Sequence, residues 1–277
     1  MLESLWEALQ LEFMRNAIIA GILVGIACGV IGTFVVVNRI VFISGGIAHA
    51  AYGGIGLAVF FQFNPLLGAI FFSLLSGIAM AVVERKTNER KDTIIGTLWA
   101  MGMSIGIILI DLTRGYKANL MNYLFGSILA VPKRDLWLML GLDLAILLMV
   151  CLLYKELLAI SFDPVFATTR NLPVDSLYLL LIGAISLTIV MVMQVVGLIM
   201  VIALLTIPPA IANQYVRGII PMMILGSLFG MVFILLGLIL SFLFNLTSGA
   251  TIILVAGTTY FLSYPFKSKS AGKLGVS

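Results

Sequence analysis

The sequence predicts an all-α protein, a polytopic transmembrane helical bundle with about nine spans, or eight on the lower count. Hydrophobic residues make up 62% of the 277 residues and charged residues only 10%, whereas about a quarter of a soluble domain is charged. The apolar residues also occur in runs of the roughly 20 residues that one helix needs to cross a bilayer. Backbone groups in lipid find partners only within the protein, so we expect these runs to be helices of one transmembrane domain over residues 1–277.

The N-terminal half contains one interfacial segment and four expected spans. Residues 1–14 place apolar side chains on one helical face and glutamates on the opposite face, a pattern typical of an amphipathic helix that lies in the membrane interface. In the first span, Gly21, Gly25 and Gly29 recur every fourth residue, which lets another helix approach closely. The four expected spans cover about 16–37, 46–61, 65–83 and 93–112.

The C-terminal half begins with the apolar segment 119–131, which is too short to cross and is expected to be re-entrant or interfacial. Residues 154–176 form a polar segment that is too long for a tight turn. The next run, 177–215, carries no charge and holds two crossings, or one crossing and a partial one, with a break near Gln194 and Gly197. The expected spans of this half are 136–153, the two parts of 177–215, 220–244 and 249–264, followed by a basic cytoplasmic tail at 265–277.

Basic residues set the expected orientation, because loops rich in Lys and Arg stay on the cytoplasmic side. Nine spans with the N-terminus outside place most Lys and Arg residues inside and put the segment 154–176 in the cytoplasm. If 119–131 crosses the membrane, the assignment on one side of it inverts. The net charge of +4 is explained by these loops, so we do not expect nucleic-acid binding. The inside residues are Arg39, Arg85, Lys86, Arg90, Lys91, Lys155, Arg170, Arg217, Lys267, Lys269 and Lys273.

The motifs of an enzyme are absent from this sequence. No Gly-rich loop ends in Gly-Lys-Ser/Thr, so any energy from ATP must come from a partner. His49 is the only histidine. Most hydrolytic and metal-dependent sites need two or more metal ligands, or a nucleophile together with its general base, and one histidine does not supply these. We therefore expect no catalytic residue and no bound cofactor. Cys28 and Cys151 lie in apolar segments and are expected to be buried free thiols.

His49 is the first candidate for a metal pathway. Helical spacing places Gly45, Gly46 and Gly53 on its face, so an ion or another backbone could come close to the imidazole. Neutral imidazole is a good ligand for zinc, manganese or ferrous iron, and polar groups at membrane depth are costly enough to indicate a role. The alternative is that His49 hydrogen-bonds a neighbouring helix and only packs.

Asp143 is the second pathway candidate, since it is the most deeply placed acidic residue in the expected spans. An ionisable group there indicates an ion pathway, and the alternative is a protonated or hydrogen-bonded packing residue. The methionines, among them Met101 and Met103, show no repeated motif and are expected to fill apolar space.

Several segments, in order and spacing, resemble the membrane permease subunits of zinc, manganese and iron ABC importers. The similarity runs from about Phe13 to Tyr264. Each motif is weak by itself, being mostly small and apolar, but the set is specific. The segments are Phe42–Gly56, Asp92–Gly102, Asn119–Gly126, Ser161–Pro164, Gly197–Ala210 and Leu246–Ile252.

The resemblance implies a type II ABC importer-like homodimer in the cytoplasmic membrane that moves a divalent transition metal ion. It also implies two cytoplasmic ATP-binding subunits and an external metal-binding receptor protein. Within 154–176, it implies a coupling helix that docks on the ATPase and transmits closure to the attached spans. The coupling residues on this reading are Phe162, Asp163, Pro164, Ala167, Arg170, Leu172 and Pro173.

Two positions depart from the family pattern. Gly45 stands where an Asp is common, and Asn119 replaces another frequent Asp. A carboxylate–imidazole site therefore does not carry over, and the ion passes with fewer protein ligands or the cargo differs from the usual one. Two other functions stay open at this point: a standalone secondary metal-ion transporter, which the shortage of buried acids disfavours, and a membrane scaffold or intramembrane enzyme.

Overall fold

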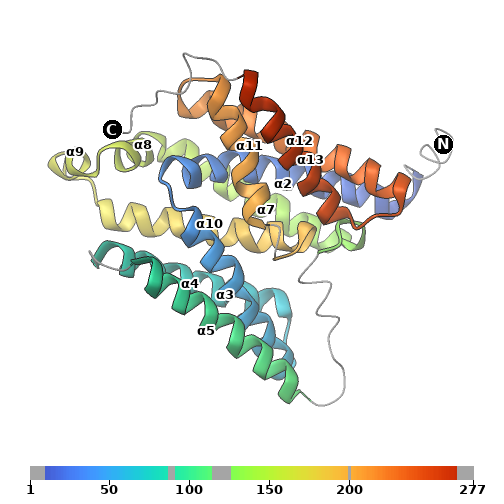
Figure 1. Ribbon diagram of the computed structural model, residues 1–277. Coiled ribbons are helices and arrows are strands. Elements are labelled where there is room, and N and C mark those ends of the chain that lie inside the picture. The colour runs from blue at the N-terminus through green and yellow to red at the C-terminus, as the bar shows by residue number, and fades with distance from the viewer. Residues whose placement is uncertain (1–9, 87–90, 114–125, 199–200, 267–277) are drawn as a thin grey trace. The chain divides into compact units, whose positions relative to one another are not determined.

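The computed structural model describes residues 10–86, 91–113, 126–198 and 201–266, and within these ranges all regular structure is helical (Figure 1). This confirms the all-α prediction. The α-helices are α2 (Glu12–Val37), α3 (Val41–Phe60), α4 (Pro65–Lys86), α5 (Lys91–Leu112), α7 (Lys133–Leu152), α8 (Tyr154–Phe162), α9 (Pro164–Thr169), α10 (Val174–Val196), α11 (Val201–Tyr215), α12 (Ile219–Phe244) and α13 (Ser248–Ser263). Two short 3₁₀ helices are η1 (Ile128–Ala130) and η3 (Tyr264–Phe266).

Seven of the described helices are long and apolar enough to cross a membrane, namely α2, α3, α4, α5, α7, α10 and α12. The helices α11 and α13 are apolar but shorter, with 15 and 16 residues. The chain is thus a multi-pass membrane protein, whereas nine full crossings remain a prediction. The interfacial helix at 1–14 and the basic tail fall mostly outside the described residues, as does most of segment 119–131.

Two predicted boundaries can be compared with the structure. The break in the long apolar run is confirmed, because α10 ends at Val196 and Gly197 takes a φ of +81°, a conformation that suits glycine. By contrast, α3 begins at Val41 rather than at residue 46. Ser44 lies within this first turn, where its hydroxyl donates to the Val41 carbonyl, so this polar side chain is satisfied inside the helix.

The described helices form two compact units, a division that the sequence did not indicate. The central unit comprises Val37–Leu120 and Ile146–Val190, and the terminal unit comprises Met1–Val36, Met121–Ala145 and Met191–Ser277. The helices α7 and α10 contribute residues to both. Each unit has its own packing.

In the central unit, α3 packs along both α4 and α5. Glycines allow this contact, because a Cβ built on Gly54 would lie 2.0 Å from the Gly68 carbonyl oxygen of α4, and one on Gly56 would lie 2.3 Å from the Gly106 carbonyl oxygen of α5. Helices in lipid gain little from burying apolar surface against each other, so close backbone packing supplies much of their association.

In the terminal unit, α11, α12 and α13 pack together, and the predicted glycine repeat of α2 meets α12. A Cβ on Gly29 would lie 2.1 Å from the Ser227 backbone nitrogen, and one on Gly25 would lie 2.7 Å from that of Met231. The Ser227 hydroxyl also donates to the Ile26 carbonyl at 3.3 Å. The repeat is thus a helix-packing surface.

These contacts predict that Gly54→Ala destabilises the protein. The added methyl group would collide with backbone rather than with a side chain that can move away, and such overpacking costs about 1–3 kcal/mol or more. Thermal unfolding of the purified protein in detergent measures the effect. Gly141→Ala is the matched control, because a Cβ on Gly141 of α7 meets nothing within 4 Å. Equal unfolding midpoints for the two variants would contradict the packing described for α3 and α4.

Candidate functional site

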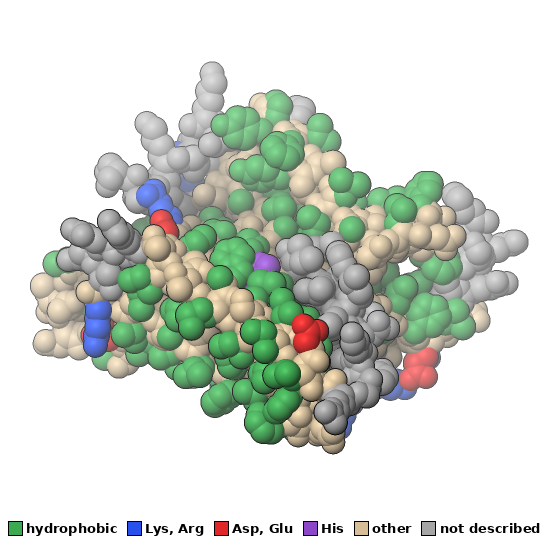
Figure 2. Space-filling model, turned by 60° about the horizontal axis from the view of Figure 1, so that its bottom comes forward, with side chains coloured by type: hydrophobic (Ala, Val, Ile, Leu, Met, Phe, Trp, Pro, Cys, Tyr) green, Lys and Arg blue, Asp and Glu red, His purple; other side chains and the backbone are tan. Residues whose placement is uncertain are grey.

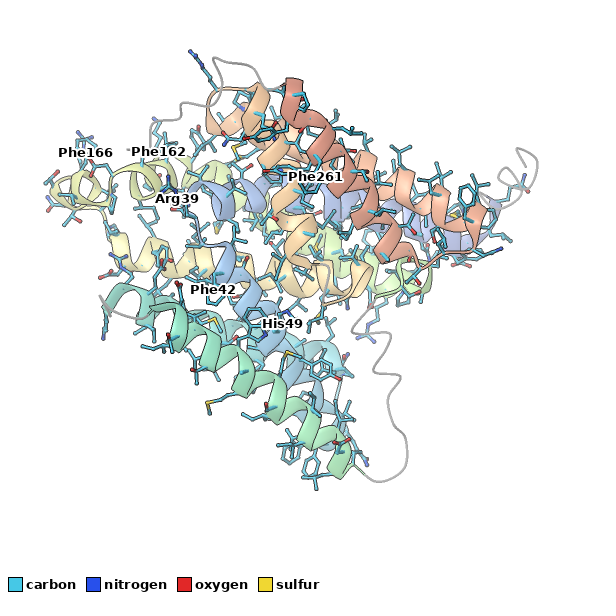
Figure 3. All side chains as sticks on the ribbon, viewed as in Figure 1. Arg39, Phe42, His49, Phe162, Phe166 and Phe261 are labelled. Atoms are coloured by element: carbon cyan, nitrogen blue, oxygen red, sulfur yellow. The ribbon has the colours of Figure 1, made fainter. Side chains whose placement is uncertain are left out.

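His49 lies on α3 of the central unit and faces α5 (Figure 3). Its ring stacks on that of Trp99, with centroids 4.4 Å apart and an interplanar angle of 19°. Its Nδ1 atom lies 3.2 Å from the Met103 sulfur. Trp99 and Met103 are four residues apart on α5, so they share one helical face. The imidazole is therefore held by two side chains of a single neighbouring helix.

The contact with Met103 determines which ring nitrogen is free. A thioether sulfur accepts hydrogen bonds and has no proton to donate. A hydrogen bond at 3.2 Å therefore requires the proton of neutral His49 on Nδ1, and Nε2 keeps its lone pair. His49 is half-buried, and Figure 2 shows its imidazole at the surface beside hydrophobic side chains. This arrangement presents one unprotonated nitrogen suited to a metal ion.

The glycines predicted to line the pathway beside His49 are all buried within α3. A Cβ on Gly46 would lie 2.9 Å from the Met80 sulfur, and one on Gly53 would lie 2.7 Å from the Gly102 carbonyl oxygen. The stripe at Gly46 and Gly53 is thus occupied by α4 and α5. Among the described residues, no group of three or more His, Cys, Asp or Glu side chains lies together to hold a metal ion.

Asp143, the second pathway candidate, lies on α7 in the terminal unit. Only 3% of its surface is exposed, and neither carboxyl oxygen has a hydrogen-bond partner. Of the two free cysteines, Cys28 on α2 is buried as expected, whereas Cys151 on α7 is exposed. A buried carboxyl group without a partner is costly until a proton, a cation or a donor satisfies it. His49 and Asp143 belong to different units.

The predicted coupling residues form a helix–turn–helix in the central unit, consisting of α8 and the six-residue α9. Asp163 ends α8 and begins α9, where its carboxylate accepts the Phe166 backbone N–H at 2.8 Å. Pro164 occupies the first turn of α9, a position in which its missing N–H costs nothing. After the end of α9, Asn171 takes a left-handed conformation, with φ 55°. The Asp-Pro pair thus sets the start of α9.

Residues 154–176, the predicted coupling segment, expose apolar side chains around this cap. Phe162, Val165 and Phe166 are 44%, 73% and 54% exposed, and Figure 3 marks the two phenylalanines. The Arg170 guanidinium lies 6.0 Å from the centre of the Phe166 ring. Ala167 is fully buried, Leu172 is half-buried, and Pro173 is exposed directly before α10. An exposed apolar cluster beside a cation is typical of a surface that binds a partner.

Two residues beside His49 were not recognised as site residues from the sequence. The sequence predicts that Met103 only fills apolar space, and it marks Trp99 only as one residue of the segment Asp92–Gly102. Their spacing of four residues on one span was visible, but an aromatic and a methionine are common in any apolar helix. Only the register between α3 and α5 shows that they contact the histidine.

The fold and these sites define a multi-pass helical membrane protein with a polar group inside its helices and an exposed apolar loop helix. The model of the ABC 3 transport family matches residues 10–267. The chain therefore belongs to this family, and the resemblance to permease subunits of metal ABC importers is confirmed.

The relatives support the same class. A membrane protein of Synechocystis, slr2045, is 64% identical over 96% of this chain and 95% of its own length. The manganese transport system membrane protein MntC of Halalkalibacterium halodurans is 34% identical over 95% of this chain and 90% of its own. The solved structure of PsaBC from Streptococcus pneumoniae in complex with Fab matches with a TM-score of 0.88 and 32% identity, covering 99% of this chain and 98% of the other.

The geometry of His49 predicts a single dominant tautomer. Because the chain has one histidine, ¹⁵N-histidine labelling gives one pair of ring-nitrogen resonances, and the proton should be found on Nδ1. Met103→Leu removes the acceptor and should shift the equilibrium toward the Nε2–H form. Met101→Leu is the control, since Met101 is 55% exposed on α5. A proton on Nε2 in the unchanged protein would contradict the Met103 hydrogen bond.

Proposed function

We propose that this chain is the membrane permease subunit of an ABC importer that moves manganese across the cytoplasmic membrane. Two copies of the chain form the pathway, two cytoplasmic ATP-binding subunits drive it, and an external metal-binding receptor protein delivers the ion. The observation that carries the ATP-driven part is the coupling segment α8–α9, whose exposed Phe162, Val165 and Phe166 suit a partner groove. No observation favours a standalone secondary transporter.

Manganese is favoured over zinc and iron by the names of the relatives. MntC of Halalkalibacterium halodurans and the import permease ScaB of Streptococcus parasanguinis are named for manganese, and they are 34% and 33% identical to this chain. Mn²⁺ binds oxygen ligands such as water readily, and an imidazole does not select Mn²⁺ over the other transition metals. In this proposal the ion keeps part of its water shell and contacts His49 Nε2 in passing. Gly45, which stands where the resembled family pattern has an Asp, supplies no carboxylate.

In this pathway the chain's own residues do not hold the ion tightly. A cargo site must bind well enough to be entered and weakly enough to be left. One imidazole oriented by Trp99 and Met103 meets that requirement better than a closed set of ligands. Asp143, buried and without a partner, supplies a second place where a cation or a proton is stabilised.

Removing the imidazole should reduce transport without affecting assembly. His49→Ala is expected to lower Mn²⁺ uptake by about tenfold or more, the usual effect of losing an ordered ligand environment. Uptake is measured with Mn²⁺, Zn²⁺ and Fe²⁺ in proteoliposomes that contain the complete complex, and co-purification of the ATPase subunit checks assembly. Asp143→Asn is expected to lower uptake as well.

The Met101→Leu variant is the control for these measurements and should transport at the rate of the unchanged protein. Uptake unaffected by His49→Ala would make the histidine a packing residue. If uptake strongly prefers Zn²⁺ or Fe²⁺, that metal and not manganese is the cargo, and the proposal that the chain belongs to an ABC importer still stands.

The coupling segment predicts where the ATPase subunit binds. Asp163→Arg removes the cap of α9, worth about 1 kcal/mol, and puts a long side chain beside the exposed cluster. It should abolish co-purification of the ATPase subunit, and Phe166→Ala should weaken it. Phe261→Ala is the control, because Phe261 of α13 is 76% exposed and lies in the terminal unit. ATPase binding that survives Asp163→Arg would place the docking surface elsewhere.

A further inference from the structure

The coupling segment is linked to the rest of the central unit at two places, the end of α8 and the start of α10. At the end of α8, the Asn38 side-chain amide donates to the Ser161 hydroxyl at 3.0 Å. Asn38 lies in the turn directly before α3, where Arg39 takes a left-handed conformation with φ 59°. Ser161 is two residues before Asp163. This hydrogen bond joins the end of α8 to the start of the helix that carries His49.

The start of α10 is joined to the end of α4 by three interactions. Arg85 Nη1 lies 2.8 Å from Asp175 Oδ1. The Tyr178 hydroxyl donates a hydrogen bond to Glu84 Oε2. The Arg85 guanidinium also lies 5.5 Å from the centre of the Tyr178 ring. Asp175 and Tyr178 are one turn apart on α10, so both face the same end of α4.

This cluster, made of Glu84, Arg85, Asp175 and Tyr178, is stronger than an isolated surface ion pair. The exposed Asp175 side chain, 81% accessible, by itself would contribute little. Arg85, however, is 35% accessible and contacts both α10 residues, and the hydrogen bond to Glu84 is assisted by a charged acceptor. The cation–π contact adds to the same junction. The four side chains restrain each other, so the ends of α4 and α10 move together.

The links also connect loops that the charge pattern places on one side of the membrane. Arg39, Arg85 and Arg170 belong to three loops predicted to be cytoplasmic, and Asn38–Ser161 and Arg85–Asp175 bring these loops together at one end of the central unit. The region where an ATPase would dock is therefore the region where α3, α4 and α10 are tied to each other.

Building on the proposed function, we propose that Glu84, Arg85, Tyr178 and Asn38 are positioning residues. They transmit the displacement of α9 to α3, the helix that carries His49. A shift of α9 pulls the start of α10, and through the cluster it pulls the end of α4. The backbones of α4 and α3 are in close contact at Gly54 and Gly68. Because tightly packed helices resist deformation, α3 moves together with α4 as one rigid body. The Asn38 link acts on the start of α3 directly.

The test separates transmission from docking and from folding. In proteoliposomes with the complete complex, Tyr178→Phe, Arg85→Gln and Asn38→Ala should leave the amount of co-purified ATPase subunit unchanged. The number of ATP molecules hydrolysed per Mn²⁺ imported should rise by about fivefold or more, the lower range of coupling between two sites. The charge swap of Arg85→Asp with Asp175→Arg should bring the ratio back toward that of the unchanged protein.

Lys133→Gln is the matched control, since it removes another ion pair, Lys133–Glu12 at 2.9 Å, in the terminal unit, and it should not change the ratio. A ratio within about twofold of the unchanged protein in all three variants would overturn the proposal. So would loss of the ATPase subunit, because the residues would then act in docking. If the unchanged complex hydrolyses ATP but imports no metal, the proposed function itself fails, and that result is distinct from a change in the ratio.

Discussion

Close approach of helix backbones is the constraint on which the rest of this structure depends. Within lipid, apolar side chains gain little by leaving one apolar surface for another, so helices associate through tight van der Waals contact. Gly54 and Gly68 bring α3 against α4, and Gly29 brings α2 against Ser227 of α12. The position of His49 depends on the contact of α3 with α5, where Gly53 lies against Gly102 and Gly56 against Gly106, because this contact sets the register in which the imidazole meets α5.

The two functional regions of the central unit have different physical requirements. The His49 environment is sparse: one imidazole, a stacked indole and a thioether, which suits an ion that must leave again. The coupling segment is instead rich in restraints, with a capped helix at Asp163 and polar links to the turn before α3 and to the end of α4. Under the proposed function, a sparse ion site and a firmly connected loop would both suit a subunit whose energy comes from another protein.

Much of the fold and part of the site were accessible from the sequence. The end of α10 at Gly197 and the cap at Asp163 were predictable because glycine, aspartate and proline act on the backbone next to them. The partners of His49 were not, because Met103 is 54 residues away along the chain. The Tyr178–Glu84 hydrogen bond spans 94 residues. Neither pair has a local signature, since each depends on how two helices are aligned.

The sequence by itself determined that this chain is helical and embedded in lipid, because backbone polar groups without water must be paired within each apolar segment. It also determined some helix ends, such as the end of α10 before Gly197 and the start of α9 at Asp163 and Pro164. Only the tertiary structure decided which face of each helix meets which neighbour. In a helix that is apolar on all sides, no pattern of hydrophobicity marks the buried face, so side-chain shape and glycine contacts select the register.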